Sequence, residues 1–326
     1  MTVFCVIVTY SDRFHLLEQV IRSCINEGVD KIIVVDNNSE INSKKKLKQL
    51  ELELGGSLRV LYLNKNSGSA GGYKRGLEEA YQDRDCEYIW LLDDDNKPDT
   101  GSLNVLKEFW EKCKIRNKNN NLCLLSYRKN RKLYKQAVIL KEPDLVLGDI
   151  NSFEGFHYKS IIKKSIRRLK KDIINNINSY PSNGIVSVAY YGGMFINKVI
   201  LDIIGYPDEK YFLYADDNDW SYRITKNGGE IYLLLNSQIT DIDPSWHTPG
   251  DTDSIFSSIS TGDPFRVYNA IKNRVYFERK YLVRNNFIYA INILMFLIIL
   301  FPFTIKNIVK YFTFIKGIRH GYKMDY

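Results

Sequence analysis

The first hundred residues alternate strand-like and helix-like patterns, and this alternation limits the folds that are open to the chain. Short runs rich in β-branched residues are each followed by a longer stretch with apolar residues at helical spacing. Strands that alternate with helices in this way build a parallel α/β sheet. The predicted strands and helices, in order, are Val3–Thr9, Phe14–Asn26, Lys31–Asp36, Ser43–Leu54, Leu58–Asn64 and Lys74–Tyr81.

Three aspartates, Asp93–Asp95, directly follow the apolar run Tyr88–Leu92, which is typical of a buried strand. The triplet is therefore expected at a strand's carboxyl end, where open α/β sheets bind ligands. Like charges this close repel each other unless a cation neutralises them. Oxygen-only ligands favour Mg²⁺ or Mn²⁺. A solvated acidic turn, which the nearby Pro98 would suit, is the alternative interpretation.

Size and charge restrict the class of protein further. A chain of 326 residues holds one large domain with an appendage, or two modest domains. Its net charge of +8 is uneven, because residues 158–180 carry +6 and residues 266–326 carry +9, which leaves −7 on the rest. This pattern favours an anionic membrane surface or a polyphosphate over nucleic acid as the partner. Five cysteines without paired metal spacing indicate buried free thiols in a reducing cytoplasm. Residues 1–8 lack a basic n-region, so no signal peptide is expected.

A loop of small residues, Gly68–Gly72, precedes the predicted helix Lys74–Tyr81. It lacks the Lys-Ser/Thr ending of a P-loop and the spacing of the dinucleotide fingerprint. A small-residue loop that opens a helix still lets a ligand approach the backbone closely. A flexible turn is the alternative.

The later part of the chain carries a second acidic cluster, Asp216–Asp219, at a predicted helix start. The helix dipole also favours acidic residues there, so a purely structural role is the alternative. Short strands are predicted over Leu122–Tyr127, Ala137–Leu140 and Ile231–Leu235.

Two segments indicate that the protein associates with a membrane. Lys159–Lys171 places basic residues between isoleucines at roughly helical spacing. Phe287–Ile305 is nearly all apolar and, at about 1.5 Å per residue, is just long enough for a bilayer core of about 30 Å. Because both of its flanks are basic, crossing would place positive charge on both sides, which favours an interfacial or re-entrant arrangement. A buried helix is the alternative.

Taken together, these motifs resemble the inverting glycosyltransferases of family 2, which have a GT-A fold. The resemblance covers Val3 to about His247 and is carried by motifs in the family's order and approximate spacing. The triplet Asp93–Asp95, the loop Asn66–Arg75 and the pair Trp246-His247 look most like the bacterial galactofuranosyltransferases, and rhamnosyltransferases share much of this pattern. The motifs are Val8-Thr9-Tyr10, Val34–Ser39, Asn66 with its glycine loop, Asp93–Asp95, and Asp216–Trp220 with Arg223.

The resemblance implies a role for each matching residue. On the donor side it implies that Asp93, Asp95 and His247 bind a divalent cation, Mn²⁺ or Mg²⁺; a loop histidine stacked on Trp246 is the alternative for His247. It implies that Asp217 is the base that deprotonates the acceptor hydroxyl, and Asp219 is expected to pair with Arg223. The nucleotide contacts that it implies are Thr9, Asp36, Asn66, Arg75 and Asp94. The implied acceptor contacts are Asp216, Tyr191, Gly192, Gly193, Trp220 and Trp246.

The sequence thus predicts an α/β protein of GT-A fold, with a Rossmann-like, mostly parallel central sheet, helices on both faces and a C-terminal helical membrane-associating region. Residues 1–265 would form the catalytic domain, with the donor half in 1–100 and the acceptor half in 183–250, and residues 266–326 the basic, apolar tail. The expected reaction transfers galactofuranose from UDP-galactofuranose to a lipid-linked glycan at the cytoplasmic face of the bacterial inner membrane, in surface polysaccharide assembly. A homo-oligomer is possible and nucleic acid is not expected. The alternatives are a rhamnosyltransferase using dTDP-rhamnose, a nucleotidyltransferase and a non-catalytic sugar-binding scaffold.

Overall fold

The computed structural model of the chain describes residues 1–114, 121–159, 181–243, 259 and 262–325. The chain forms two compact units. Unit 1 comprises Met1–Pro143, Pro181–Phe212 and Asp216–Asp243. Unit 2 comprises Asp144–Tyr180, Leu213–Ala215 and Pro244–Tyr326.

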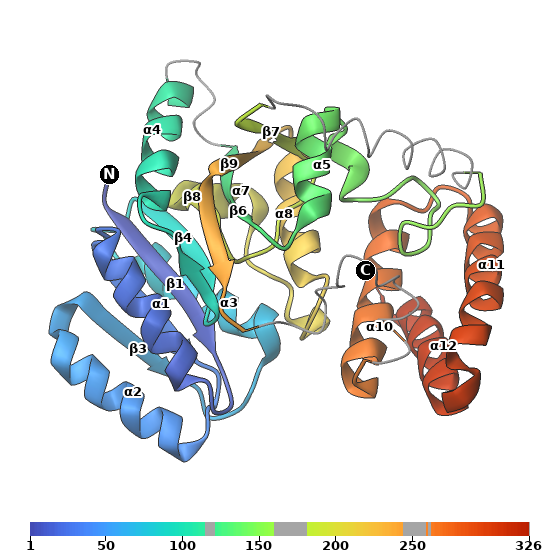
Figure 1. Ribbon diagram of the computed structural model, residues 1–326, viewed down its shortest axis with the longest axis horizontal. Coiled ribbons are helices and arrows are strands. Elements are labelled where there is room, and N and C mark those ends of the chain that lie inside the picture. Colours follow the sequence, from blue (N-terminus) through green and yellow to red (C-terminus); the bar gives the residue numbers. More distant parts are fainter. Residues whose placement is uncertain (115–120, 160–180, 244–258, 260–261, 326) are drawn as a thin grey trace. The chain divides into compact units, whose positions relative to one another are not determined.

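The amino-terminal half of unit 1 is a parallel α/β sheet, as the alternating pattern predicts. Its strands lie in the order β3-β2-β1-β4, and every neighbouring pair is parallel. Figure 1 shows α1 and α2 side by side along this part of the sheet. The strands are β1 (Val3–Thr9), β2 (Lys31–Asp36), β3 (Leu58–Tyr62) and β4 (Tyr88–Asp93), and the helices are α1 (Phe14–Asn26), α2 (Ile41–Leu54), α3 (Gly68–Gln82) and α4 (Ser102–Lys114).

The second half of unit 1 extends the same sheet with mixed strand directions. Beyond β4 the order continues β8-β6-β9-β5, and β7 pairs with β9. β8 is antiparallel to both β4 and β6, whereas β9 is parallel to β6. The added strands are β5 (Asn96–Pro98), β6 (Leu122–Arg128), β7 (Asn183–Val186), β8 (Met194–Asn197) and β9 (Glu230–Asp241). The added helices are α5 (Lys132–Leu140), α7 (Leu201–Ile204) and α8 (Asp216–Lys226).

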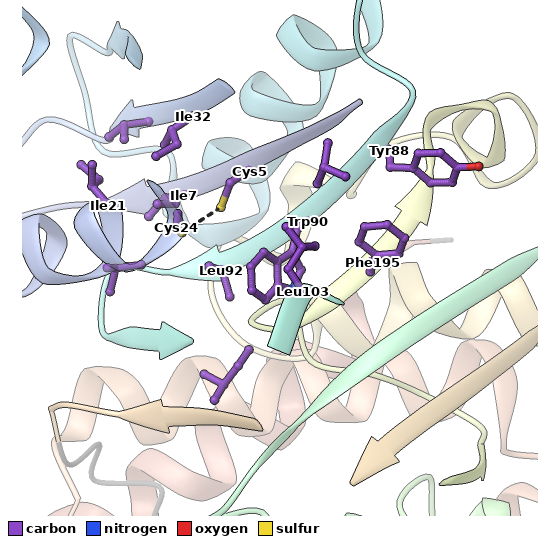
Figure 2. Close-up of a cluster of buried hydrophobic side chains, with 14 of the residues drawn as sticks. Cys5, Ile7, Ile21, Cys24, Ile32, Tyr88, Trp90, Leu92, Leu103 and Phe195 are labelled. Atoms are coloured by element: carbon purple, nitrogen blue, oxygen red, sulfur yellow. Dashed lines mark hydrogen bonds between the residues drawn. The ribbon is translucent and has the colours of Figure 1, made fainter. Parts of the chain in front are cut away.

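One face of the sheet packs against α1, α2 and α4 through a continuous apolar core. Figure 2 shows Trp90 and Leu92 of β4 in this core together with Leu103 of α4. Alternate side chains of β1 point to this face, among them Cys5, whose sulfur lies 3.7 Å from that of Cys24 on α1. All five cysteines are free thiols and four are buried, in agreement with the prediction from their spacing.

The opposite face of the sheet is covered by α3, which approaches it unusually closely. A Cβ on Gly72 would lie 2.6 Å from Val8 Cγ1, and one on Gly76 would lie 2.4 Å from Val6 Cγ1. Real Cβ atoms do not approach other atoms so closely, so only glycine fits at these two positions. The small-residue loop is itself the first turn of this helix, which begins at Gly68.

One predicted strand is wrong, because Ala137–Leu140 belongs to the helix α5. Ala137 and Val138 are buried, and Val138 packs against Gly184 of β7. An apolar run of four residues is too short to distinguish a strand from a helix by its periodicity. The other elements predicted within the described residues are present, with ends that differ by up to six residues. Residues 160–171 of the predicted basic segment Lys159–Lys171 lie outside the described residues.

Unit 2 contains three long helices, α10 (Pro264–Tyr281), α11 (Asn286–Thr304) and α12 (Ile308–Lys323), among its described residues. Their core includes Phe296 and Phe314, whose rings stack 5.7 Å apart. The stretch Asn286–Lys323 is long and apolar enough to cross a membrane, although 33% of its apolar window is buried inside the protein.

Candidate active site

Three of the predicted site residues lie at neighbouring strand ends of unit 1. Thr9 at the end of β1 pairs with Asp36 at the end of β2, and Val8 pairs with Asp93 at the end of β4. The chain runs outward from β1 to β2 and β3, and then returns to the other side of β1 with β4. Such a reversal opens a crevice at the carboxyl edge of an α/β sheet, which is where these folds bind ligands.

Thr9 and Asp36 are both buried at this edge of the sheet. The Thr9 hydroxyl donates to Asp94 Oδ2 over 2.7 Å, and Asp94 is 3% exposed. Asp36 is fully buried, and its Oδ1 accepts from the Ser39 amide. Its Oδ2 has no hydrogen-bond partner among the described residues and lies 3.7 Å from Lys44 Nζ. Because a buried, unsatisfied acceptor is costly, Asp36 Oδ2 suits a donor group on a ligand.

The other two predicted nucleotide contacts, Asn66 and Arg75, lie on the entry to α3 and on its surface. Asn66 Oδ1 accepts from the Gly68 amide over 2.8 Å and from Asn37 Nδ2 over 3.1 Å, so it shapes the turn into the helix. Arg75 is half exposed and forms an ion pair with Glu78 at 2.9 Å. Their contacts with a nucleotide stay predictions.

Arg13 gathers carboxylates from two distant parts of the chain. Its Nε lies 3.0 Å from Asp94 Oδ1, and its Nη2 lies 2.9 Å from Asp95 Oδ2. Its Nη1 lies 2.6 Å from Asp243 Oδ2, just beyond β9. Arg13 therefore joins the end of β4 to the end of β9.

Arg128, the last residue of β6, joins Asp93 at the end of β4 to Asp241 at the end of β9. Its Nη1 lies 3.1 Å from Asp93 Oδ2, and its Nη2 lies 2.7 Å from Asp241 Oδ1. The hydroxyl of Tyr73 donates to the other oxygen of Asp93 over 2.6 Å. Asn96 donates to both Asp95 and Asp241 over 2.8 Å. Asp93 is thereby held in one orientation.

The aspartate triplet retains excess negative charge in spite of these arginines. Burial raises the pKa of Asp94 to about 6, against the opposing charge of Arg13. Burial, and then the charges of Asp93 and Asp94, raises the pKa of Asp95 to about 7. The site therefore favours a further positive charge near these three carboxylates.

Two aspartates in the first turn of α8 are fixed by contacts within the protein. Asp216 is 2% exposed and accepts from the Ser69 hydroxyl over 2.7 Å. Asp219 is fully buried and accepts from Arg223 Nε over 3.0 Å, which confirms the predicted pairing. Burial, and then the charge of Asp217, raises the pKa of Asp216.

Asp217 lies between these two and is partly exposed. Among the described residues its only hydrogen bond is from the amide of its neighbour Asn218, over 2.7 Å. Burial raises the pKa of Asp217 to about 6, and the charge of Asp93 contributes to this rise, whereas the charges of Arg131 and Arg128 oppose it. The two acidic clusters, far apart in sequence, therefore lie close enough to interact.

The predicted acceptor residue Tyr191 lies beside these carboxylates. It is 5% exposed, and its ring centre is 4.0 Å from that of Tyr73 and 5.8 Å from that of Trp220. Burial, and then the charge of Asp216, raises its pKa well above the ordinary value. Trp220 is fully buried and donates its indole N–H to the Gly205 carbonyl over 2.8 Å, so it supports Tyr191 from within the core.

Gly192 and Gly193 bring the backbone against the metal-side carboxylates. A Cβ on Gly192 would lie 1.7 Å from Asn96 Oδ1 and 2.9 Å from Asp93 Oδ2, so no larger residue fits there. Gly193 has φ +114°, a conformation that glycine adopts most readily. Trp246 and His247 lie outside the described residues.

Comparison with known proteins decides the family. The model of glycosyl transferase family 2 matches residues 5–169, just over half of the chain. The chain belongs to glycosyltransferase family 2. Its activity is therefore that of a glycosyltransferase, as the sequence predicts.

Two curated relatives carry different sugar names. The glycosyltransferase is 23% identical to the dTDP-rhamnosyl transferase RfbF of Shigella flexneri, over 85% of this chain and 80% of that protein. It is also 23% identical to the galactofuranosyltransferase GlfT1 of Mycolicibacterium smegmatis, over 69% of this chain and 66% of that protein.

A solved structure confirms the predicted fold class. The glycosyltransferase superposes on the crystal structure of GalNAc-T7 with UDP, GalNAc and Mn²⁺ with a TM-score of 0.56 and 13% identity. The match covers 86% of this chain and 48% of that one, so this chain spans about half of its length. The mixed α/β sheet of the glycosyltransferase is thus of the GT-A type, with a long apolar helix near the C-terminus.

The oxygen atoms at the end of β4 could supply some, but not all, of the ligands that a divalent cation needs. Asp93 and Asp95 offer only oxygen atoms. Asn96 Oδ1, which is buried without a hydrogen-bond partner among the described residues, lies like Asp93 Oδ2 against Gly192. Such all-oxygen sets suit Mg²⁺ or Mn²⁺. Among the residues that the structure describes, no group of three His, Cys, Asp or Glu side chains completes a metal site. The third predicted ligand, His247, belongs to the part not described.

Sequence reasoning missed Arg13, Arg128 and Tyr73 in the glycosyltransferase. A signal existed for the two arginines, because each stands at or just beyond a strand that ends at the site. Tyr73 lies in the glycine-rich helix α3, and no local pattern indicates its hydrogen bond to Asp93.

Proposed function

We propose that the protein is an inverting, metal-dependent transferase that moves galactofuranose from UDP-galactofuranose to a lipid-linked glycan. This reaction would serve bacterial surface polysaccharide assembly, such as a capsule or O-antigen. The observation that carries the proposal is the position of Asp217, a carboxylate that forms no ion pair with any described residue and lies within electrostatic reach of Asp93. Within this proposal residues 1–265 act as the catalytic domain and residues 266–326 as the membrane-associating region.

The chemistry proposed for Asp217 is that of a general base. The acceptor hydroxyl oxygen forms a bond to the anomeric carbon on the face opposite the nucleoside diphosphate, and the bond from that carbon to the diphosphate oxygen breaks. The hydroxyl proton passes to Asp217, which its pKa of about 6 leaves mostly ionised near neutral pH. A divalent cation held by Asp93, Asp95 and His247 would offset negative charge on the departing diphosphate. Arg128 and Tyr73 orient Asp93 for that task.

The nucleotide is proposed to lie along the ends of β1, β2 and β4. Asp36 Oδ2, which accepts no hydrogen bond from a described residue, suits an N–H of the base or a ribose hydroxyl, and the Thr9–Asp94 pair suits the ribose. This placement leaves the sugar near Asp93 and Asp217. Asp216, Tyr191, Gly192, Gly193 and Trp246 stay the proposed acceptor contacts, with Trp220 behind Tyr191.

Transfer of rhamnose from dTDP-rhamnose is the second candidate. It is favoured by the rhamnosyl transferase relative, which matches a larger share of this chain than the galactofuranosyltransferase relative does. The sequence features that favour galactofuranose are the aspartate triplet, the Asn66–Arg75 loop and Trp246-His247.

We also propose a peripheral position on the cytoplasmic face of the inner membrane. In unit 2 the helices α11 and α12 and the turn between them carry exposed apolar side chains, which together we call the apolar elbow. The buried face of α11 uses other residues, so the elbow side chains lie outside the buried core of unit 2. The residues of the apolar elbow are Leu294, Ile298, Phe301, Phe303, Ile305, Ile308, Val309 and Phe312.

A donor panel tests the proposed reaction. Purified protein is incubated with UDP-galactofuranose, UDP-galactopyranose or dTDP-rhamnose plus Mn²⁺, and nucleotide release is followed with and without membrane lipid extract. The proposal expects release from UDP-galactofuranose alone, and loss of that release in EDTA. Preferential release of dTDP would replace galactofuranose by rhamnose, and full activity in EDTA would remove the metal.

A further inference from the structure

The loop that follows β6 contains polar atoms without partners beside the proposed base. Arg128 Nε, Asn130 Oδ1 and Arg131 Nε are all buried, and none has a hydrogen-bond partner among the described residues. Buried polar groups in folded proteins are nearly always paired. Three such atoms within four consecutive residues make this part of the chain a candidate binding site.

Arg131 differs from the other cations of this loop. Arg128 is paired with Asp93 and Asp241, and Lys129 is paired with Asp99 at 2.6 Å. The guanidinium of Arg131 forms no hydrogen bond or ion pair with any described residue, although it is only partly exposed. Asp217 lies within electrostatic reach of Arg131 but forms no hydrogen bond with it. Partly burying a cation without a hydrogen-bonded anion costs free energy, which binding of an anion would recover.

The guanidinium of Arg131 is nevertheless held in place. It lies 5.9 Å from the ring centre of Tyr190, within the range of a cation–π contact. Tyr190 is itself fixed, because its hydroxyl donates to the Ser126 carbonyl and accepts from the Arg128 amide, both over 3.0 Å. Arg131 is therefore positioned before a ligand arrives, which lowers the entropic cost of binding one.

The position of Arg131 in the sheet favours the acceptor over the nucleotide. In the strand order β3-β2-β1-β4-β8-β6, the residues proposed to hold the nucleoside end β2 and β1, and Asp93 ends β4. Arg131 follows β6, on the far side of Asp93 from the nucleoside. Its charge acts on Asp217, the group proposed to meet the acceptor hydroxyl.

We propose that Arg131 binds an oxyanion, a phosphate or a carboxylate, that the acceptor carries close to its reacting hydroxyl. The inference rests on the proposed function and adds the chemical class of the acceptor. A planar guanidinium with parallel N–H donors matches the oxygens of either group. A lipid-linked glycan supplies a phosphate through its diphosphate linkage, and an acidic glycan supplies a carboxylate.

The test measures anion binding while the nucleotide site is filled. Protein saturated with UDP and Mn²⁺ is titrated with inorganic pyrophosphate or with glucuronate, and the shift of Tm gives the affinity. The wild type should bind one of these two probes on top of UDP, and the probe that binds identifies the source of the oxyanion. Arg131→Gln should weaken that binding about ten- to hundredfold, as expected for charge-assisted hydrogen bonds, and Arg131→Lys should weaken it less.

Arg59→Gln is the matched control, because Arg59 is an exposed arginine on β3 that pairs with Glu79 of α3. It should leave both UDP and anion binding unchanged. Two outcomes would overturn the inference: no probe binding to the UDP-saturated wild type, or weakened UDP binding in Arg131→Gln with probe binding intact. The second would assign Arg131 to the donor diphosphate. A wild type that does not bind UDP at all would instead count against the proposed function itself.

Discussion

At the scale of single residues, three aspartates in one helical turn show how surroundings divide tasks among identical side chains. Asp219 is fully buried and paired with Arg223, and Asp216 accepts a hydrogen bond from Ser69. Among the described residues Asp217 has neither an ion pair nor a side-chain hydrogen bond. A carboxylate that must accept a proton has to keep a lone pair free. The contacts therefore select Asp217 as the proposed base and Asp219 as a structural residue.

Asn substitutions at Asp217 and Asp219 should affect different properties, turnover in the first case and stability in the second. Asp217→Asn should lower turnover by about 10²- to 10⁴-fold, which is the usual contribution of a general base, and leave Tm and UDP binding unchanged. Asp219→Asn should lower the free energy of unfolding by about 3 kcal/mol, because it leaves Arg223 without its anion. Nucleotide release measures turnover, and thermal unfolding measures stability. Normal turnover in Asp217→Asn would exclude it as the base.

The pH profile follows from the same carboxylate. Since burial raises the pKa of Asp217 to about 6 and the base acts in its ionised form, activity should be full above that pKa. It should fall about tenfold per unit as pH drops further below 6. Arg131→Gln removes a charge that lowers this pKa, so it should move the acid limb of kcat/KM to higher pH. An acid limb near pH 4 in the wild type would contradict this assignment.

At the scale of elements, the close packing of α3 on the sheet depends on two glycines. A Cβ on Gly76 would lie 2.4 Å from Val6 Cγ1 and 3.1 Å from Val35 Cγ2. Gly76→Ala should therefore destabilise the protein by about 1–3 kcal/mol through overpacking, as measured by urea unfolding. Gly56→Ala is the control, because a Cβ there has nothing within 4 Å. Equal stability of the two variants would show that α3 moves freely to make room.

The elements themselves could be predicted from the sequence, whereas several site contacts could not. Strands such as Val3–Thr9 and Lys31–Asp36 follow from local periodicity alone, and their carboxyl ends bring Thr9 and Asp36 together. The pairing of Arg13 with Asp243 joins residues 230 positions apart, and no local pattern indicates it. The same holds for Arg128 and Asp93, whose contact depends on the order of β4, β8 and β6.

The end of β4 should link metal binding to the pH dependence of stability. Burial raises the pKa values of Asp94 and Asp95, to about 6 and about 7, above the ordinary value near 4. The folded state then binds more protons than the unfolded state between pH 4 and 7, so stability should rise as pH falls through this window. Mn²⁺ should flatten this dependence, because it favours the ionised carboxylates. Thermal unfolding from pH 8 to 5 with Mn²⁺ or EDTA measures it, and identical curves would exclude a metal at this site.

At the scale of the whole molecule, the tail of the chain combines an exposed apolar surface with positive charge. Ile298, Val309 and Phe312 of the apolar elbow are 63%, 66% and 62% exposed. Soluble proteins rarely expose large contiguous apolar patches without a binding role. Lys306 and Lys310 lie within the same stretch, and residues 285–324 contain no acidic residue. Because the opposite face of α11 is buried against the core of unit 2, these features favour a helix that lies on an anionic membrane over one that crosses it.

Charged substitutions in the apolar elbow should therefore release the protein from lipid. Ile298→Asp and Val309→Asp should each weaken binding to anionic phosphatidylglycerol vesicles by about tenfold or more, since burying an aliphatic side chain contributes about 1.5–3 kcal/mol. Leu52→Asp is the matched control, because Leu52 is 84% exposed on α2 in unit 1 and belongs to no such surface. Co-sedimentation gives the affinities, and sedimentation velocity shows whether the elbow instead joins two copies of the chain. A variant that changes the oligomeric state without changing lipid binding would assign the elbow to a protein interface.

The depth of the helix in the membrane can be measured with the variant Phe301→Trp. Because the buried face of α11 stays within unit 2, the fluorescence of this tryptophan should be quenched more by lipids brominated near the headgroup than by lipids brominated near the chain end. Stronger quenching by the deeper bromine would mean that the helix enters the bilayer core and that the packing of unit 2 opens on the membrane.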